Sequence, residues 1–311
     1  MNLRQAIIVF LCCCGVALQS PLVSASSALE LLGGFDRQRV QACYPVDDAG
    51  SAAEMAKLLY RLRGTNEEQL QKRVTRSTDS SVAGTPVPGD VVQVDGSIDA
   101  IKQYPLPEDL REYLEMPAFQ EVVLSTEAGF KVSVFAPPLA GQIAKGDRIS
   151  ATAILVARAD ESIAYAAGRL AWYPKQPTRE GWKLLAGVDF DLSLIAGAAS
   201  RNRRVLEADD HDAFYGLLNA SAKVQADSTF AGQNATDVDP VALLTKPAEF
   251  YGEWIEMDAS TVRISQIAID SAEIAQQLGQ DHYFQIDASG DLGKKSCSCN
   301  VPKARLVRRF R

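Results

Sequence analysis

The spacing of apolar residues predicts a helix near the start of the chain. Ser51 and Glu54 have the Ser-x-x-Glu spacing of a capping box, and Gly64 is a suitable stop. Between them, apolar residues recur on one helical face: Met55, Leu58, Leu59 and Leu62. The pattern therefore predicts an amphipathic helix over 52–63, followed by a polar linker over 65–88 that is rich in Ser, Thr, Gln and Arg.

From Gly89 the period changes from helical to strand-like. The segment holds five apolar-rich runs, at 92–101, 119–124, 130–135, 147–156 and 165–172. Turn residues separate most of the runs: 126–129 is typical of a hairpin, and 145–147 of a tight entry into a strand. We therefore expect five strands between 89 and 173.

Five short strands with an insert at 137–144 after the third resemble the OB-fold, a small five-stranded Greek-key barrel. The resemblance covers 89–173 and is one of strand number and spacing, not of a motif. It implies a ligand face on the second and third strands and the adjoining loops. That face would draw on aromatic and cationic side chains that can stack on bases or sugars: Phe119, Phe130, Lys131, Phe135 and Arg148. Alternating phenylalanines also fit core positions, so both interpretations stay open.

Helical spacing returns over 174–246, where a helix is expected to begin near Asp209. Its apolar face carries four residues: Phe214, Leu217, Leu218 and Ala222. Carboxylates and an imidazole cluster at its start: Asp209, Asp210, His211 and Asp212. These groups could share a divalent ion. Acids at a first helical turn also complement the helix dipole, and this second interpretation is favoured.

Two further carboxylates, Asp189 and Asp191, lie two positions apart. On a strand they would point to opposite sides, so we expect both to be solvated.

An internal similarity links the two halves of the chain. Residues 89–97 align without a gap on 252–260, with Gly, acid, two apolar residues and Asp at matching positions. Further on, Phe119-Gln120 has a counterpart in Phe284-Gln285. The sequence therefore predicts a partial second β-module over 247–293.

The segment 294–311 departs from this pattern. It carries seven Lys or Arg residues, no acid and no strand-like alternation. We expect a disordered basic tail, so that the second barrel is cut short. A frameshifted end and a genuine interaction tail both remain open.

The first 25 residues have the plan of a secretory signal: Arg4, an apolar run over 6–18, and small residues before a cut after Ala25. Export to the periplasm, cell envelope or exterior is therefore expected, and an uncleaved membrane anchor is the alternative. Beyond the signal stand three cysteines, Cys43, Cys297 and Cys299, which allow at most one disulfide. Unpaired thiols are favoured.

Charge and histidine content narrow the function classes. Residues 26–293 carry 24 basic and 39 acidic groups, a net charge of −15, which repels phosphate polymers and argues against nucleic acid as partner. The chain holds two histidines, His211 and His282, so a three-histidine metal site is excluded. No phosphate loop, nucleophile elbow or dinucleotide fingerprint is present.

The expected fold is α+β, a small OB-like barrel flanked by helical segments (26–88 and 174–246) and followed by an incomplete second module. For function, the sequence favours an exported, non-catalytic binding or structural module that uses no cofactor. Its partner is unknown, and another exported protein or an envelope component is a candidate. Membrane contact is expected only through an uncleaved N-terminus. Two alternatives stay open: a metal-dependent enzyme using 209–212, and single-stranded nucleic-acid binding by the barrel.

Overall fold

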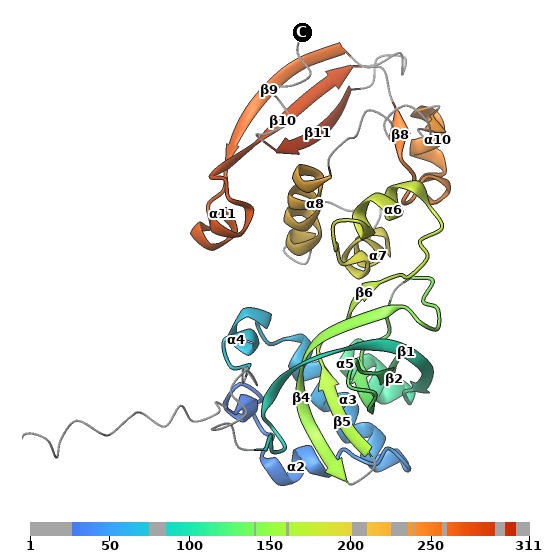
Figure 1. Cartoon of the computed structure of the whole chain (residues 1–311), viewed down its shortest axis with the longest axis vertical. Helices are drawn as coiled ribbons and strands as arrows, with labels where there is room; N and C mark the ends of the chain where they lie inside the picture. Colours follow the sequence, from blue (N-terminus) through green and yellow to red (C-terminus); the bar gives the residue numbers. More distant parts are fainter. Residues whose placement is uncertain are drawn as a thin grey trace, which may run out of the picture.

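The chain folds into two lobes joined by a narrow connection (Figure 1). The computed structural model describes residues 27–74, 85–139, 141–159, 162–200, 210–224, 236–238, 240–256, 260–289 and 296–302. Helices and a mixed six-stranded sheet form the first lobe, and further helices with a three-stranded sheet form the second. The expected α+β class is confirmed.

The first lobe is built around a closed ring of five strands. They are β1 (Val91–Pro105), β2 (Ala118–Ser125), β3 (Lys131–Ala136), β4 (Arg148–Ala159) and β5 (Ser162–Ala167). The order is β1-β2-β3-β5-β4, and β4 pairs back with β1. Only the β3–β5 pairing is parallel among these strands. This is the strand order of an OB-like barrel, so the predicted resemblance is confirmed. The fifth predicted run divides into β5 and a short β6 (Ala171–Tyr173), which pairs with β4.

Strand β1 closes the ring because it pairs with two different strands along its length. Its first half pairs with β4 and its second half with β2, and the change falls at Ser97. Gly96 stands beside this change, and a Cβ there would lie 2.9 Å from the carbonyl oxygen of Ser125. Glycine at this position thus lets the backbones of β1 and β2 approach closely where β1 changes its partner strand from β4 to β2.

A layer of helices covers one outer side of the barrel. The predicted helix is present as α3 (Ala49–Arg63) and ends at Gly64 as expected. The predicted cap was wrong: Asp48 is the N-cap and accepts a 2.7 Å hydrogen bond from the amide of Ser51. Short elements that the periodicity did not reveal are η1 (Ala28–Glu30), α2 (Arg37–Gln41), α4 (Glu67–Gln71) and α5 (Glu108–Leu114).

Two apolar cores hold the first lobe together. One lies between the helices and the outer face of the barrel, and its fully buried members include Leu58 and Leu59 of α3 and Ile154 of β4. The other fills the barrel interior, around Val122 and Ile149, and continues toward the second lobe. The barrel is therefore buried on both faces where α3 covers it.

The second lobe contains helices α6 (Glu180–Ala186), α7 (Leu192–Ser200), α8 (His211–Lys223), α10 (Pro240–Thr245), η3 (Pro247–Glu249) and α11 (Ala272–Leu278). Its strands are β7 (Thr236–Asp237), β8 (Ile255–Glu256), β9 (Ser260–Ala268), β10 (His282–Ser289) and β11 (Ser296–Pro302). Strands β9, β10 and β11 form an antiparallel sheet with β10 in the centre. Strand β7 pairs with β8 in parallel.

The expectation of a tail without a strand is corrected in part. Residues 296–302 form β11, which pairs with β10 from Ser289↔Ser296 to Tyr283↔Pro302. The other residues of the predicted tail, and the predicted signal over 1–25, lie outside the described residues. Cys43 is buried and has a free thiol, as expected. Among the described residues, no helix has the length and apolarity needed to cross a membrane.

Candidate functional site

The ligand face that the barrel resemblance implied does not form as expected. Phe119 and Phe135 are 0% and 1% exposed, and their ring centroids lie 6.3 Å apart in the core beneath the helices. The ring of Tyr104 stacks on Phe119 at 4.9 Å. Assigning these two phenylalanines to a ligand face was therefore wrong, because buried rings cannot stack on a ligand.

The other three predicted residues are at the surface. Phe130 is 67% exposed at the β2–β3 hairpin, and Lys131 beside it forms an ion pair with Asp99 at 3.1 Å. The guanidinium of Arg148 lies 4.0 Å from the ring centroid of Tyr173 and also forms an ion pair with Asp189. Both cations therefore already have anionic partners, which reduces their attraction for phosphate.

Carboxylates also mark the outer side of β1 and β2. Asp99 accepts a 2.8 Å hydrogen bond from the Ser125 hydroxyl, and this bond and Lys131 lower the pKa of Asp99. Glu121 accepts hydrogen bonds from the hydroxyls of Tyr104 and Ser133, at 2.9 and 2.7 Å. These negative charges disfavour a nucleic-acid strand on this face.

The predicted metal cluster is only partly visible, because Asp209 lies outside the described residues. Asp210 occupies the N-cap position of α8 and is 5% exposed, and Asp212 lies in the first helical turn. The His211 ring packs edge-on against Tyr215, with centroids 5.9 Å apart. Within the described ranges, no group of three or more His, Cys, Asp or Glu side chains could hold a metal ion.

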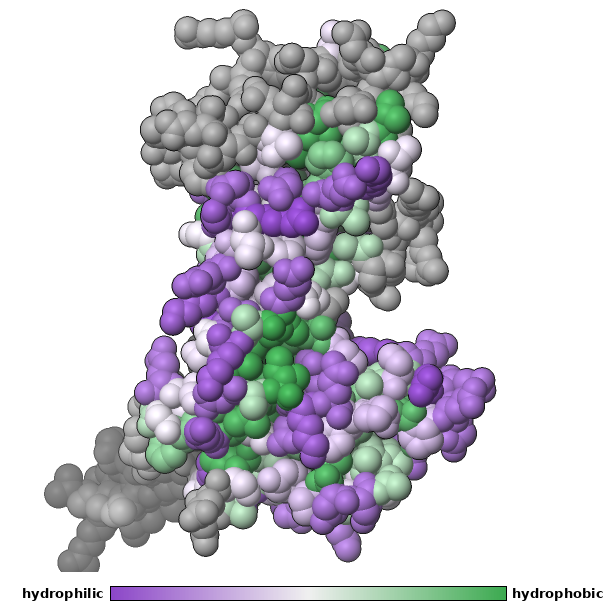
Figure 2. Space-filling model, turned by 90° about the vertical axis from the view of Figure 1, so that its right-hand side faces the viewer, coloured by the Kyte–Doolittle hydropathy of each residue, from purple (hydrophilic) through white to green (hydrophobic). Residues whose placement is uncertain are grey.

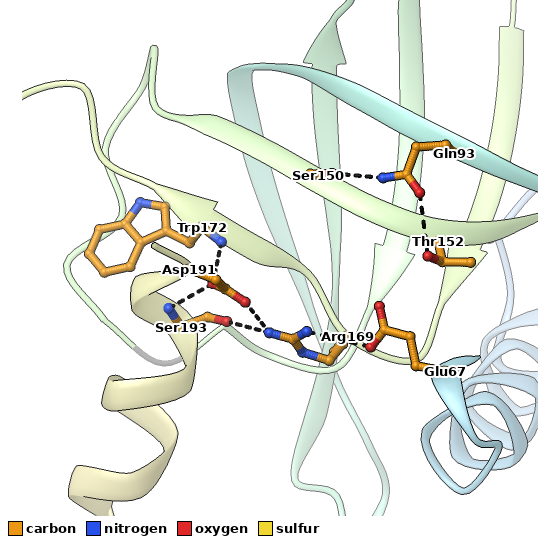
Figure 3. Close-up of polar contacts among 8 residues, drawn as sticks. All are labelled: Glu67, Gln93, Ser150, Thr152, Arg169, Trp172, Asp191 and Ser193. Carbon is orange, nitrogen blue, oxygen red and sulfur yellow. Dashed lines mark hydrogen bonds and ion pairs between the residues drawn. The ribbon is translucent and has the colours of Figure 1, made fainter. Parts of the chain in front are cut away.

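Asp191 is the centre of a polar network that joins the lobes (Figure 3). It accepts hydrogen bonds from the amides of Trp172 and Ser193, at 2.8 and 3.0 Å, and forms an ion pair with Arg169. Arg169 also contacts Glu67 of α4 at 3.4 Å. The side chain of Asp191 is only 10% exposed, so the expectation of a solvated carboxylate was wrong.

A second polar group in Figure 3 is a cross-strand contact. Gln93 of β1 donates a 2.7 Å hydrogen bond to the Ser150 hydroxyl of β4 and accepts one of 3.4 Å from Thr152. A cleft of about 220 Å³ lies nearby and includes Thr152 and Arg169 in its lining. Since Arg169 already pairs with Asp191 and Glu67, its positive charge is neutralised within the protein. We assign this network to structure.

An apolar opening lies in the second lobe, among α6, α7, α8 and the segment 252–254. Its volume is about 430 Å³. This volume is within the range of small-molecule pockets, and its lining is mainly apolar. Its lining includes Trp182, Leu185, Ile195, Leu217, Ser221 and Trp254. We refer to this opening as the α8 pocket.

The wall beside α6 depends on a glycine. Gly252 has φ +81°, and a Cβ there would lie 2.2 Å from Nε1 of Trp182. Because Gly252 has no side chain, the indole of Trp182 can pack directly against the Gly252 backbone. The amide of Trp182 also donates a 3.3 Å hydrogen bond to the Gly252 carbonyl. Trp182 also packs edge-on against Trp172 and Tyr251, with centroids 6.2 and 5.4 Å apart. This wall is thus held rigidly.

The opposite wall is the apolar face of α8. Leu217 is 37% exposed there, whereas Leu218 is 4% exposed. Phe214 packs edge-on against Tyr283 of β10 at 5.4 Å, which ties the helix to the sheet. The sequence predicted this helical face, but the contribution of Gly252 depends on contacts between distant segments, and only the alignment of 252–260 on 89–97 marked that glycine.

Two polar side chains in the lining, Ser221 and Glu253, are engaged within the protein, whereas the buried Nε1 of Trp182 has no hydrogen-bond partner among the described residues. Ser221 donates a 2.8 Å hydrogen bond to the carbonyl of Leu218, as hydroxyls in helices commonly do. Glu253 forms an ion pair with Arg179 at 3.1 Å. The α8 pocket therefore offers apolar contact more than reactive chemistry.

Apolar side chains are also exposed on the face of the molecule that Figure 2 shows. Figure 2 shows hydrophobic atoms gathered on the first lobe just below the narrow middle of the molecule, with polar atoms along their border, and a smaller hydrophobic group on the second lobe. Apolar surface that is exposed in patches and rimmed by polar groups is typical of interaction sites.

Comparisons with known proteins add little to this geometry. No family model matches the chain, and no curated protein matches it. One similar solved structure is the second OB-fold domain of replication protein A from Methanococcus maripaludis. It is 11% identical, covers 29% of this chain and 90% of that chain, and has a TM-score of 0.21. A TM-score this low supports no inference about what this chain binds.

Proposed function

We propose that this protein is an exported, non-catalytic binding module and that the α8 pocket is its binding site. The single observation that carries the proposal is the pocket itself, a mainly apolar cavity of about 430 Å³ that is open to solvent at Leu217. Burying apolar area contributes about 25 cal/mol per Å², so an apolar ligand would bind here by removing this surface from water.

The internal contacts of Ser221 and Glu253 favour binding over catalysis. A general base needs a free lone pair beside a proton to be abstracted. In the lining, Ser221 donates to a helix carbonyl and Glu253 is held by Arg179. The cluster around Asp210 remains the alternative for an enzyme, and metal titration of the wild type and Asp210→Ala tests it.

Binding of single-stranded nucleic acid remains a second alternative. The acidic side chains Asp99 and Glu121 on the outer barrel face oppose it, as does the net charge of −15 over residues 26–293. Salt-dependent retention of the mature protein on an oligonucleotide column would favour this alternative.

The binding proposal is tested with an environment-sensitive apolar dye, 1-anilinonaphthalene-8-sulfonate, titrated into the full chain. We expect one saturable site in the wild type and at least about tenfold weaker binding in Leu217→Asp. Val262→Asp is the matched control, since Val262 is a 67% exposed apolar residue on β9 outside the pocket. Equal dye binding by all three proteins would overturn the proposal.

Export is proposed on the plan of residues 1–25 and has its own test. Mass spectrometry of the N-terminus from fractionated cells is expected to find a chain that begins at Ser26 outside the cytosol. Met1 intact in the cytosolic fraction would contradict export.

A further inference from the structure

We infer that the α8 pocket binds a small amphiphile through a quaternary ammonium group, which is a nitrogen cation with four carbon substituents. This inference rests on the proposed binding role of the pocket and names the chemical class of its ligand. Three properties of the lining carry it: aromatic rings on separate walls, a single charged side chain that is negative, and few hydrogen-bond acceptors.

Three aromatic side chains line the pocket from different segments of the chain. Trp182 belongs to α6, Phe214 to α8, and Trp254 to the segment that leads into β8. Among the described residues, Trp182 and Phe214 make ring contacts only with aromatic residues outside the lining, so no two of the three lining rings pack on each other. A ligand in the pocket therefore meets aromatic surface on more than one wall.

Aromatic faces attract cations, because the π electrons give each face a partial negative charge. The attraction is strongest at tryptophan and increases when the cation has lost its water. A quaternary ammonium ion is covered by carbon, so it enters an apolar pocket at a lower desolvation cost than a primary ammonium ion. The aromatic lining therefore favours a quaternary cation over other charged groups.

Glu253 is the one charged side chain in the lining that the structure describes. Its Oε1 accepts a 3.1 Å hydrogen bond from Arg179, which lies outside the lining, whereas its Oε2 accepts none from the described residues. The net charge of −15 over residues 26–293 acts in the same direction at longer range. The charge of the pocket therefore complements a cationic ligand and disfavours an anionic one.

The hydrogen-bond acceptors of the lining separate a quaternary from a primary ammonium ion. A primary ammonium carries three N–H donors, and each donor costs free energy when it is buried without an acceptor. Of the side-chain oxygens, only those of Ser221 and Glu253 lie in the described lining. The Gly252 carbonyl already accepts from the amide of Trp182. A quaternary ammonium has no N–H donor to satisfy, so it suits this surface better.

The volume of the pocket limits the size of the ligand. At about 430 Å³ it is near the lower end of the roughly 300–1,000 Å³ found for small-molecule sites. A trimethylammonium group with a short apolar chain is of this size. Leu185, Ile195 and Leu217 of the lining would contact the chain. The ligand class is therefore a small molecule with one quaternary nitrogen and one apolar chain.

The test compares three ligands of equal length by calorimetry on the full chain. The first is a six-carbon alcohol that ends in a trimethylammonium group, the second is its uncharged isostere that ends in a tert-butyl group, and the third is the corresponding primary amine. We expect the quaternary compound to bind one-to-one and at least about tenfold more tightly than either of the others. Because the isostere has the same shape and apolar surface, its weaker binding measures the contribution of the charge.

Two variants locate the cation in the pocket. Trp254→Leu removes an aromatic wall, and Glu253→Gln removes the negative charge of the lining. Each is expected to lower the ratio of the affinities for the quaternary compound and its isostere by at least about threefold. Glu249→Gln is the matched control, since Glu249 is an exposed acid of the same region outside the lining, and its ratio should equal that of the wild type. Circular dichroism confirms that each variant is folded.

Dye binding together with equal affinities for the quaternary compound and its isostere would overturn this inference and leave the proposed function standing. Failure of the dye and of all three ligands to bind would overturn both. A primary amine that binds as tightly as the quaternary compound, or an affinity ratio that is unchanged in both pocket variants, would also overturn the inference. Choline headgroups of a membrane carry the same cation, so co-sedimentation with phosphatidylcholine vesicles without binding of the free compound would contradict a small soluble ligand.

Discussion

The indole Nε1 of Trp172 donates a 2.8 Å hydrogen bond to Oδ2 of Asp147, and both side chains are almost fully buried. The same carboxylate accepts from the amides of Ala144 and Lys175, each at 2.9 Å. One side chain therefore satisfies three donors, of which the Trp172 indole is buried, where β4 begins and β6 ends. It ties the barrel to the connection between the lobes.

Asp147→Ala is expected to lower the free energy of unfolding by about 2–4 kcal/mol, because it leaves three donors without an acceptor. Urea denaturation followed by tryptophan fluorescence measures the change. Asp95→Ala is the control, since Asp95 is an exposed carboxylate on β1 and its loss should have little effect. Similar midpoints for both variants would contradict the role of Asp147.

Gly89→Ala is expected to destabilise the fold more than Gly129→Ala. Both glycines have positive φ, +93° and +81°, so both substitutions strain the backbone by about 1 kcal/mol. Only at Gly89 would the new Cβ also collide with Leu29, at 2.8 Å, while Gly129 has open space. We expect an additional cost of about 1–3 kcal/mol at Gly89 by thermal or urea unfolding. Equal costs would show that Leu29 moves aside freely.

Glu54 links α3 to α2 through an ion pair with Arg39 at 2.7 Å and also pairs with Lys57. Hydrogen bonds from these two cations lower the pKa of Glu54 below its ordinary 4.5. A lowered carboxylate pKa stabilises the fold above about pH 4.5, and the contribution disappears as the pH falls through the folded-state pKa.

Glu54→Gln should therefore lower stability by about 0.5–1 kcal/mol at neutral pH, since the ion pairs are partly exposed. The difference from the wild type should shrink as the pH falls below 4.5 and through the folded-state pKa. Urea midpoints of both proteins across this pH range measure it. A difference that grows at low pH would contradict this sign.

The thiol of Cys43 should resist alkylation in the native state. It is 0% exposed, and burial raises its pKa to about 12, so almost no thiolate is present at pH 8. Iodoacetamide labelling followed by peptide mass spectrometry should find Cys43 unmodified in buffer and modified in urea. Rapid native labelling would show that the core between α2 and α3 opens readily.

The barrel was predictable because its strands carry their own signals. Alternation and turn residues located β2, β3 and β4 within a few residues, and the hairpin at Gly129 follows the predicted turn. Helix α5 was missed because seven residues give too few turns for a period to stand out. The cap of α3 was misplaced because Asp48 and Ser51 are both good N-cap residues, and only the structure shows which one binds the helix amides.

The candidate site was harder to foresee, since it depends on relations between distant segments. The aromatic residues Phe119 and Phe135 have the alternation of a ligand face, but α3 and α5 cover them. The α8 pocket requires the register between Trp182 and Gly252, 70 positions apart. The repeat around Gly252 was the one sequence signal that pointed toward this region.

The most direct test of a binding pocket on α8 is hydrogen–deuterium exchange of the full chain with and without the dye 1-anilinonaphthalene-8-sulfonate. If the dye occupies the α8 pocket, exchange should slow in α6 and α8, and the first-lobe strands β1 and β4 should be unchanged. Protection confined to the first lobe, or no protection in α6 and α8 at saturating dye, would contradict the account.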